Sequence, residues 1–293
     1  MVLKQFLIIL VFSIAVCLPS MAGADAVSYT GRTAGRTNDG NIETGDDRVL
    51  ETGEELLYKV YYGFIKLGEV KFKITGVATE NKKEIYSATA SIKSFESIPM
   101  VNINYIFESV MQHRNNEVFS VKFTSTEFKE KTITNIYYTF DYEDGYLRSK
   151  KETDGIVIDE RNIKMEYTKM FQDGLSLFYN ARLQSYYARN AKDKLRYNVP
   201  VFINEKESSV KYSFSPKPEA VSTDLVDYDM SGIKVAGAAD FVGVFGLTGE
   251  FLGWFSDDDA RVPLKAKFNV TIGSITLELS SYKKKNWKPP VRK

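Results

Sequence analysis

One stretch of the chain concentrates residue types that could bind a ligand or a metal ion. Residues 253–264 carry an indole, Trp254, followed by three consecutive carboxylates at 257–259 and by Arg261. Calcium loops place their aspartates at alternate positions, and this run does not. We therefore predict a turn in which carboxylates accept backbone N–H bonds and one of them pairs with Arg261. Trp254 has two interpretations, a core aromatic or a stacking surface for a sugar or an acyl chain.

The candidate ligand-binding residues come from this stretch and from a predicted helix: Trp254, Asp257, Asp258, Arg261 and Tyr179. The chain contains 18 Tyr, 19 Phe and 2 Trp residues, enough aromatics to line an amphipathic cleft as well as a core. We predict no catalytic residue, no metal site and no cofactor.

Most catalytic signatures are missing from the sequence. The single histidine, His113, lies beside a predicted turn and is expected to be a surface residue. One histidine and one cysteine give little support for thiol catalysis, for a histidine-rich zinc site or for a Ser-His-Asp triad. The sequence also lacks a nucleophile elbow, a phosphate loop and a dinucleotide fingerprint. An enzyme that works with carboxylates alone, such as a glycosidase, stays open, but nothing selects a pair from 38 acidic residues.

The first 22 residues have the layout of a secretory signal peptide. An apolar run at 6–18 follows a basic residue and is ended by Pro19. This run is too short for a transmembrane helix. Small residues then predict cleavage after Ala22 or Ala24, so we expect an exported protein of the periplasm or the medium, with no transmembrane segment in the mature chain.

Cys17 raises an alternative in which a lipid is attached to the chain. Lipoprotein processing prefers Gly, Ala or Ser before the cysteine, and Val16 stands there, so ordinary cleavage is favoured. The mature protein would then contain no cysteine and no disulfide. Residues 23–48 are rich in Gly, Thr, Asn and Asp, which predicts a disordered leader.

Charge excludes one class of partner. The 39 basic and 38 acidic residues nearly cancel, which argues against a general nucleic-acid binder. Six basic residues and no acidic one lie in 283–293, and we predict that this basic tail is an exposed extension. It could contact anionic lipid, or it could simply be solvated.

Short segments of alternating apolar and polar residues, rich in Ile, Val, Thr, Tyr and Phe, predict β-strands along residues 49–282. They are 56–62, 70–74, 84–94, 101–110, 118–128, 133–142, 155–163, 197–203, 209–214, 221–228, 232–236, 264–270 and 275–279. We expect a single, mainly β domain: a large curved antiparallel sheet or a partly open β-barrel.

One segment follows a helical period instead. Apolar residues including Leu175, Tyr179 and Leu183 recur at helical spacing within 175–189, and Asp173 stands where an N-cap is expected. We predict a single amphipathic helix that buries its apolar stripe against the sheet.

Several motifs together resemble a family of exported bacterial proteins known as domain of unknown function 3108. They are residues 53–58 with Gly63 and 67–69, the helix start at 173–182, and 249–258, 261–264, 272–275 and 277–279. The resemblance implies a Gram-negative envelope protein rich in antiparallel β structure. It implies no activity and no site residue.

These observations lead to three hypotheses. The first is a non-enzymatic envelope protein that binds a lipid or another hydrophobic ligand in an apolar cleft. The alternatives are a carboxylate-based envelope enzyme that acts on glycans, and a structural or assembly protein that binds another envelope protein through an edge strand or a patch.

Overall fold

The computed structural model describes residues 48–81, 83–99, 101–166, 169–189, 195–241, 249–270 and 273–293. The predicted signal peptide, and nearly all of the predicted leader, lie outside these residues.

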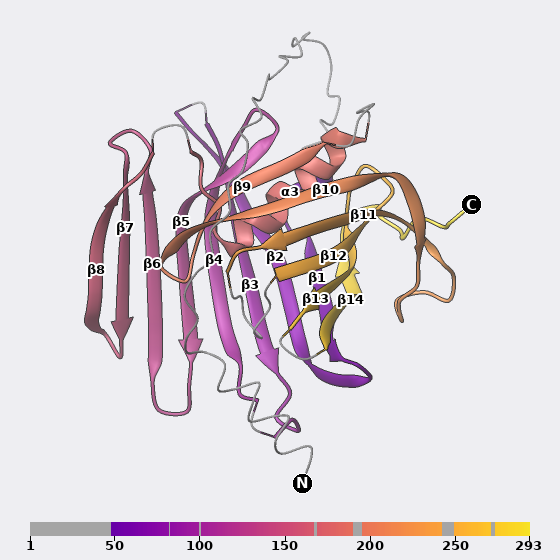
Figure 1. Cartoon of the computed structure of the whole chain (residues 1–293), viewed down its shortest axis with the longest axis horizontal. Helices are drawn as coiled ribbons and strands as arrows, with labels where there is room; N and C mark the ends of the chain where they lie inside the picture. Colours follow the sequence, from indigo (N-terminus) through magenta and orange to yellow (C-terminus); the bar gives the residue numbers. More distant parts are fainter. Residues whose placement is uncertain are drawn as a thin grey trace. The chain divides into compact units, whose positions relative to one another are not determined.

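Within the described residues, antiparallel strands form one 14-stranded sheet (Figure 1). The strands are β1 (Glu55–Tyr62), β2 (Ile65–Glu80), β3 (Lys83–Ser94), β4 (Asn104–Arg114), β5 (Glu117–Phe128), β6 (Ile133–Asp141), β7 (Tyr146–Thr153), β8 (Ile156–Lys164), β9 (Arg196–Ile203), β10 (Lys206–Val221), β11 (Met230–Ala239), β12 (Gly249–Ser256), β13 (Pro263–Asn269) and β14 (Ser274–Lys283). The predicted mainly β fold is confirmed, and strand pairing does not close the sheet into a barrel.

The sheet consists of two meanders, which are joined because the last strand of the chain pairs with the first. The strands from β1 to β8 pair in sequence order, the strands from β9 to β14 do the same, and β14 pairs with β1. On β1 the alternation of the sequence becomes alternation of burial, since Leu56, Tyr58 and Val60 are buried between more exposed neighbours. The two edges of the sheet are therefore β8 and β9.

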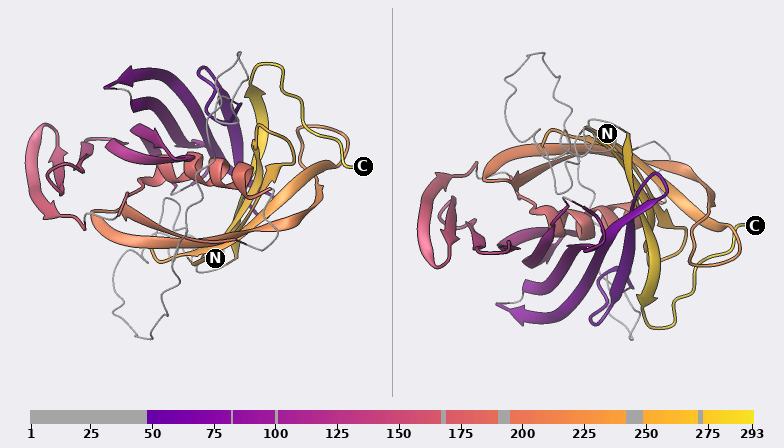
Figure 2. Two further views of the ribbon diagram at one scale, coloured as in Figure 1. Left: turned by 90° about the horizontal axis from the view of Figure 1, so that it is seen from above. Right: turned by 90° about the horizontal axis from the view of Figure 1, so that it is seen from below.

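The predicted helix exists as α3 (Gly174–Ala188), with Asp173 as its N-cap. It lies between the first strands of the sheet and the strands β9 to β12, so the sheet curls around it (Figure 2). Leu175, Tyr179 and Leu183 pack against β2 to β5, while Leu177 and Ala181 pack against β9 to β12.

The surroundings of α3 differ from the prediction of an amphipathic helix on a sheet surface. Polar residues are buried as well, among them Asn180, Arg182 and Gln184, because sheet strands cover both sides of the helix. Each of these three side chains has hydrogen-bond partners. The interior is therefore filled by a helix that places these three polar side chains against partners on the surrounding strands and turns.

The segment just before α3 connects two distant strands. Phe171 accepts a hydrogen bond from the backbone N–H of Ser120 on β5, at 2.9 Å. Gln172 donates to Pro200 and accepts from Phe202, both on β9, at 3.0 and 2.8 Å. The edge of β9 is thus tied to β5. Strands β6, β7 and β8 continue beyond this tie, and we call these three strands the wing.

Two local predictions were wrong. Residues 146–153 form β7 although their sequence, Tyr-Leu-Arg-Ser-Lys-Lys-Glu-Thr, is too charged to suggest a strand. Residues 222–229 form a loop between β10 and β11 rather than a strand. In addition, Pro216 and Pro218 lie at a register shift inside β10, where proline is tolerated because the regular ladder is interrupted.

The basic C-terminal segment is not an exposed extension throughout. Lys284, Trp287 and Pro289 are buried against the domain. Pro290 accepts a hydrogen bond from the N–H of Ser231, at 2.8 Å, and the segment pairs with Met230 through a bridge at position 291. The apolar and aromatic residues between the basic ones provide these contacts. In the part of the chain that the structure describes, no helix is long and apolar enough to span a membrane.

Candidate functional site

The turn between β12 and β13 is organised by Asp258. Its Oδ1 accepts the N–H groups of Ala260 and Arg261, at 3.0 and 3.2 Å, and the hydroxyl of Ser256 at 2.7 Å. Its Oδ2 accepts the indole N–H of Trp287 at 2.8 Å. Arg261 has a positive φ of 46°, a conformation that the bonded turn holds in place. The predicted turn, with a carboxylate accepting backbone N–H groups, is confirmed.

Arg261 points into the domain rather than toward solvent. Its side chain is buried, and Nη1 donates to the carbonyl of Ser256 at 3.0 Å and to Oδ1 of Asp257 at 3.4 Å. Burial lowers the pKa of Arg261, against the opposing effect of Asp257. The third carboxylate, Asp259, pairs with Arg48 and Arg189 at the surface. These contacts hold the turn together.

A buried ion pair lies directly behind this turn. Arg182 of α3 is 0% exposed and Glu54, just before β1, is 1% exposed. Nη1 and Nη2 of Arg182 donate to the two carboxylate oxygens of Glu54, at 2.5 and 2.9 Å. Nε and Nη2 also donate to the carbonyls of Arg261 and Ala260, both at 3.1 Å. One guanidinium therefore joins the helix, the first strand and the turn.

A second cation completes the cluster. Lys284, whose side chain is 2% exposed, lies 2.8 Å from Glu54 and 3.0 Å from Glu51. Burial alone would raise the pKa of Glu54, but Arg182 and Lys284 together outweigh it and hold that pKa below its usual value. We call Glu51, Glu54, Arg182 and Lys284 the ion cluster. Its two positive and two negative charges balance. Because these groups pair with one another, the cluster is suited to holding parts of the chain together, which we call a clamp role.

The candidate Tyr179 lies inside the domain next to the ion cluster. Its ring is fully buried, and the guanidinium carbon of Arg182 lies 5.6 Å from the ring centre. The hydroxyl of Tyr179 has no hydrogen-bond partner among the described residues, whereas that of Tyr58 donates to the carbonyl of Pro263 at 2.8 Å. Burial raises the pKa of both phenols.

Trp254 is separate from the other candidates. Its neighbour Phe255 packs against the strands that cover α3, so alternation along β12 directs Trp254 to the opposite face of the sheet. There its indole N–H donates to Glu219, and Nζ of Lys234 lies 5.7 Å from the ring centre. The structure brings Asp257, Asp258 and Arg261 together at the turn. Trp254 is not part of this group, because its side chain contacts Glu219 and Lys234 instead.

The residues of the ion cluster were not singled out from the sequence, although one signal was present. Arg182 stands seven residues after Leu175 and three after Tyr179, which places a charge on the predicted apolar stripe of the helix. A charge at such a position requires a buried partner. The sequence alone does not identify that partner, because Glu54 is 128 residues away along the chain.

A second buried carboxylate, Asp173, is used by the start of α3. Oδ1 accepts the N–H groups of Leu175 and Ser176, at 2.7 and 2.8 Å. Oδ2 accepts the hydroxyls of Ser109 on β4 and Ser120 on β5, at 2.6 and 2.7 Å. Burial nevertheless raises the pKa of Asp173, against these four hydrogen bonds. The cap thus also attaches the helix to the sheet.

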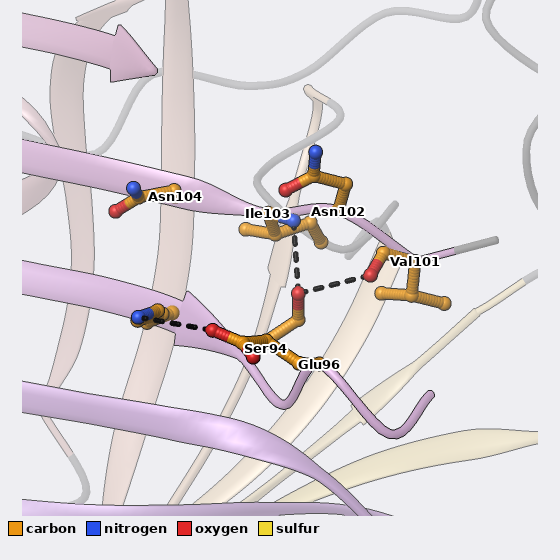
Figure 3. A pocket seen from close by; sticks show the side chains of 7 residues that line it. Ser94, Glu96, Val101, Asn102, Ile103 and Asn104 are labelled. Atoms are coloured by element: carbon orange, nitrogen blue, oxygen red, sulfur yellow. Dashed lines mark hydrogen bonds and ion pairs between the residues drawn. The ribbon is translucent and has the colours of Figure 1, made fainter. Parts of the chain in front are cut away.

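Two hollows in the described surface are lined by residues other than the candidates. A pocket of about 360 Å³ lies at the β3–β4 loop, where the hydroxyl of Ser94 bonds Val101 and Ile103 (Figure 3). Another of about 420 Å³ lies at the loop after β10, around Tyr228. Neither is lined by the turn, by Tyr179 or by Trp254.

The described residues also provide no grouping of three His, Cys, Asp or Glu residues suited to a metal ion. Their buried carboxylates, Glu54 and Asp173, face cations and hydrogen-bond donors rather than each other. The pair of carboxylates that a glycosidase needs across a cleft is therefore not formed by these two acids.

Comparison with solved structures finds relatives of the fold. A β-barrel-like protein of domain of unknown function DUF1849 from Brucella abortus matches with a TM-score of 0.51 and 10% identity, covering 80% of this chain and 99% of that one. A Bacteroides fragilis protein described as having a YmcC-like fold matches with a TM-score of 0.31 and 7% identity, over 80% of this chain and 97% of that one. At 10% identity, the match to the Brucella abortus protein shows a similar fold and nothing more.

The comparison with curated protein sequences finds no match. A family model, by contrast, covers most of the domain: the model described as protein of unknown function (DUF3108) matches residues 57–280, from β1 to β14. The family resemblance drawn from the sequence motifs is thus confirmed, and this chain belongs to the DUF3108 family.

Proposed function

We propose that this chain is an exported, non-enzymatic envelope protein that binds lipid at one end of its sheet rather than in its interior. The interior is an unfavourable place for a lipid because α3 occupies it and packs against strands on both of its sides. The observation that carries the proposal is the position of the exposed apolar side chains.

Four of these side chains, including the two most exposed ones, lie at turns that share one end of the sheet. In a meander of antiparallel strands, the turns β1–β2, β5–β6 and β7–β8 lie at the same end, and they are seen at the lower end of the sheet in Figure 1. Phe64 and Ile65 occupy the first of these turns, and Ile133 and Ile156 begin the strands after the other two. We call these four residues the apolar tips.

Phe64 is the most exposed large apolar residue described, at 94%. It sits in a two-residue turn between the paired residues Tyr62 and Ile65, and Gly63 supplies the positive φ of 58° that such a turn requires. The turn is short, so it holds the phenyl ring away from the sheet. An exposed aromatic ring in this position is suited to insertion into an apolar phase.

The end of the wing carries the other tips. Ile133 is 43% exposed and Ile156 is 69% exposed. The turn at Asp154 joins them, since its N–H donates to the carbonyl of Ile133 and its carboxylate accepts the N–H of Ile133. The two tips are therefore held next to each other at the end of the wing.

The spacing of the tips favours a lipid surface over a protein pocket. The two groups of tips lie on turns separated by several strands, with polar residues such as Lys93 and Glu96 between them. A fluid apolar layer can accept separate side chains at one level without matching the surface between them. Both acidic and basic residues lie near these turns, such as Lys129, Glu130 and Asp154, so apolar insertion, rather than net charge, would supply the affinity.

Vesicle binding tests this proposal. The purified mature chain is sedimented with vesicles of phosphatidylethanolamine and phosphatidylglycerol. We expect Phe64→Ser to weaken the partition at least about tenfold, because burying a phenyl ring contributes about 2 kcal/mol. Salt is expected to have a small effect, in contrast to binding by charge.

The matched control is Val77→Ser, which changes an apolar residue that is 52% exposed at the opposite end of β2. It should leave the partition unchanged. Wild-type protein that does not sediment with vesicles, or equal losses from both variants, would contradict the proposal.

Export is tested separately by sequencing the N-terminus of the protein from its native host. Cleavage after Ala22 or Ala24 would leave Gly23 or Asp25 as the first residue. A retained Met1, or a lipid on Cys17, would contradict ordinary secretion.

A further inference from the structure

The two edge strands of the sheet differ in whether their outer side is hydrogen-bonded to another part of the chain. The edge of β9 is tied to β5 through Phe171 and Gln172. The other edge, β8, has β7 as its strand partner on one side, and no described strand pairs with its other side. In an antiparallel sheet, alternate N–H and C=O groups of an edge strand point outward, so β8 offers a row of donors and acceptors.

The side chains of β8 are accessible on both faces. Ile156, Val157 and Ile158 are 69, 46 and 55% exposed, and of the remaining six residues only Asp159 and Ile163 are partly buried. A central strand of the sheet such as β3 alternates buried and less buried residues instead. We propose that β8 accepts an extended segment of another protein as an additional antiparallel strand.

The charges along β8 specify the chemistry of that segment. From Asp159 to Lys164 the strand reads acidic, acidic, basic, polar, apolar, basic. Cross-strand neighbours stabilise a sheet when their charges are opposite and destabilise it when they are alike. The added strand should therefore carry bases opposite Asp159 and Glu160, and acids opposite Arg161 and Lys164. An apolar residue should lie opposite Ile158.

A second copy of this chain fits the edge less well. Antiparallel pairing of two β8 strands about their midpoint would place the two Glu160 side chains opposite each other, while each Asp159 would face the Arg161 of the other copy, so charge alone does not decide against it. That pairing would also point the apolar tips of the two copies in opposite directions, because the two-fold axis reverses the strands. A different protein with the complementary pattern fits the edge better.

A designed peptide tests this inference with a probe of known sequence. The peptide Glu-Val-Thr-Glu-Lys-Lys-Val, with blocked termini, places each charge opposite its complement when it runs antiparallel from Lys164 to Ile158. The control Lys-Val-Thr-Lys-Glu-Glu-Val has the same composition and net charge but makes every cross-strand pair repulsive. Backbone amide shifts of the folded protein are followed by NMR during titration with each peptide.

We expect the first peptide to shift amides of residues 156–164 and to bind at least about tenfold more tightly than the control, since four pairs change sign. Glu160→Lys should reduce the difference in affinity between the two peptides. It should leave the Phe64-dependent sedimentation with vesicles unchanged, which separates this inference from the lipid proposal. Equal affinities, shifts confined to residues outside β8, or no shift at millimolar peptide would overturn it.

Discussion

Arg182 and Glu54 face each other inside the domain as a two-pronged ion pair, with contacts of 2.5 and 2.9 Å and almost no exposure of either residue. The pair joins α3 to the start of β1, and the remaining donors of Arg182 hold the turn before β13. The side chain of Arg182 thus attaches α3 both to the start of β1 and to the turn before β13.

Removing one partner of this pair should destabilise the domain strongly. Arg182→Met leaves Glu54 buried with Lys284 as its remaining cation, and breaking a buried pair costs about 3 kcal/mol or more. Thermal unfolding should shift down by roughly 10 °C for a domain of this size. The control is Arg48→Met, which breaks an ion pair in which Arg48 is 48% exposed and should move the midpoint little. Similar shifts for both variants would contradict a clamp role.

The turn at residues 256–262 should depend on Asp258 more than on its neighbours. Asp258→Ala removes the acceptor for two backbone N–H groups and leaves the indole N–H of Trp287 unpaired, at a cost of about 2 kcal/mol. Asp259→Ala removes only surface ion pairs and is expected to cost less than about 1 kcal/mol. Urea unfolding curves of the two variants give the comparison. A larger loss for Asp259→Ala would contradict it.

Local pattern was sufficient for most of the fold. The alternation in β1 and the cap at Asp173 are short-range signals, and each appears in the structure where the sequence indicated it. Strand β7 was missed because its charged residues pair with residues distant in the chain, as Lys151 does with Glu205 in the turn between β9 and β10. The sequence predicted a curved sheet or partly open barrel, but it could not show that β5 and β9 are connected through Phe171 and Gln172, because that connection joins distant parts of the chain.

The candidate site was less predictable than the fold. The sequence indicated the turn at Asp257 and Asp258 because its residues are neighbours in the chain. It could not separate Trp254 on β12 from Tyr179, which is buried on α3 inside the domain, and it could not pair Glu54 with Arg182. Charge partners distant in sequence leave no periodic signal, and neither do surface tips such as Phe64.

Acid should weaken the fold in a defined range through Glu55. Hydrogen bonds from Lys71 and Lys73 lower the pKa of Glu55 from 4.5 to about 2. A carboxylate with a lower pKa in the folded state adds stability above pH 4.5, and that stability is lost as the pH falls toward 2. Glu54 acts in the same direction, whereas Asp173, whose pKa is raised, acts in the opposite one.

Glu55→Gln should therefore flatten the decline of the urea midpoint between pH 4.5 and 2, and 1 M salt should reduce the difference from wild type. Parallel declines for the variant and wild type would show that Glu55 is not the group responsible.

The C-terminal segment should contribute to stability despite its basic composition. Deleting residues 284–293 removes Lys284 from the ion cluster and the ring of Trp287, which packs edge-on against Tyr282 with ring centres 4.5 Å apart. We expect a loss of at least about 3 kcal/mol, since Glu54 loses a buried partner. Deleting Lys293 alone, which is exposed, should have no measurable effect. Unchanged unfolding of the longer deletion would restore the prediction of a solvated tail.

The hydroxyls of Tyr58 and Tyr179 offer a contrast within one buried region. Tyr58→Phe removes the donor to the carbonyl of Pro263 and should cost about 1 kcal/mol. Tyr179→Phe removes a hydroxyl that has no partner among the described residues, so it should be neutral or stabilising by up to about 1 kcal/mol. Both variants keep their rings, so packing is unchanged and the urea midpoints report the hydroxyls alone. If Tyr179→Phe instead destabilises the domain as much as Tyr58→Phe, the Tyr179 hydroxyl must make a polar contact in solution, and its place among the candidate ligand-binding residues would gain support.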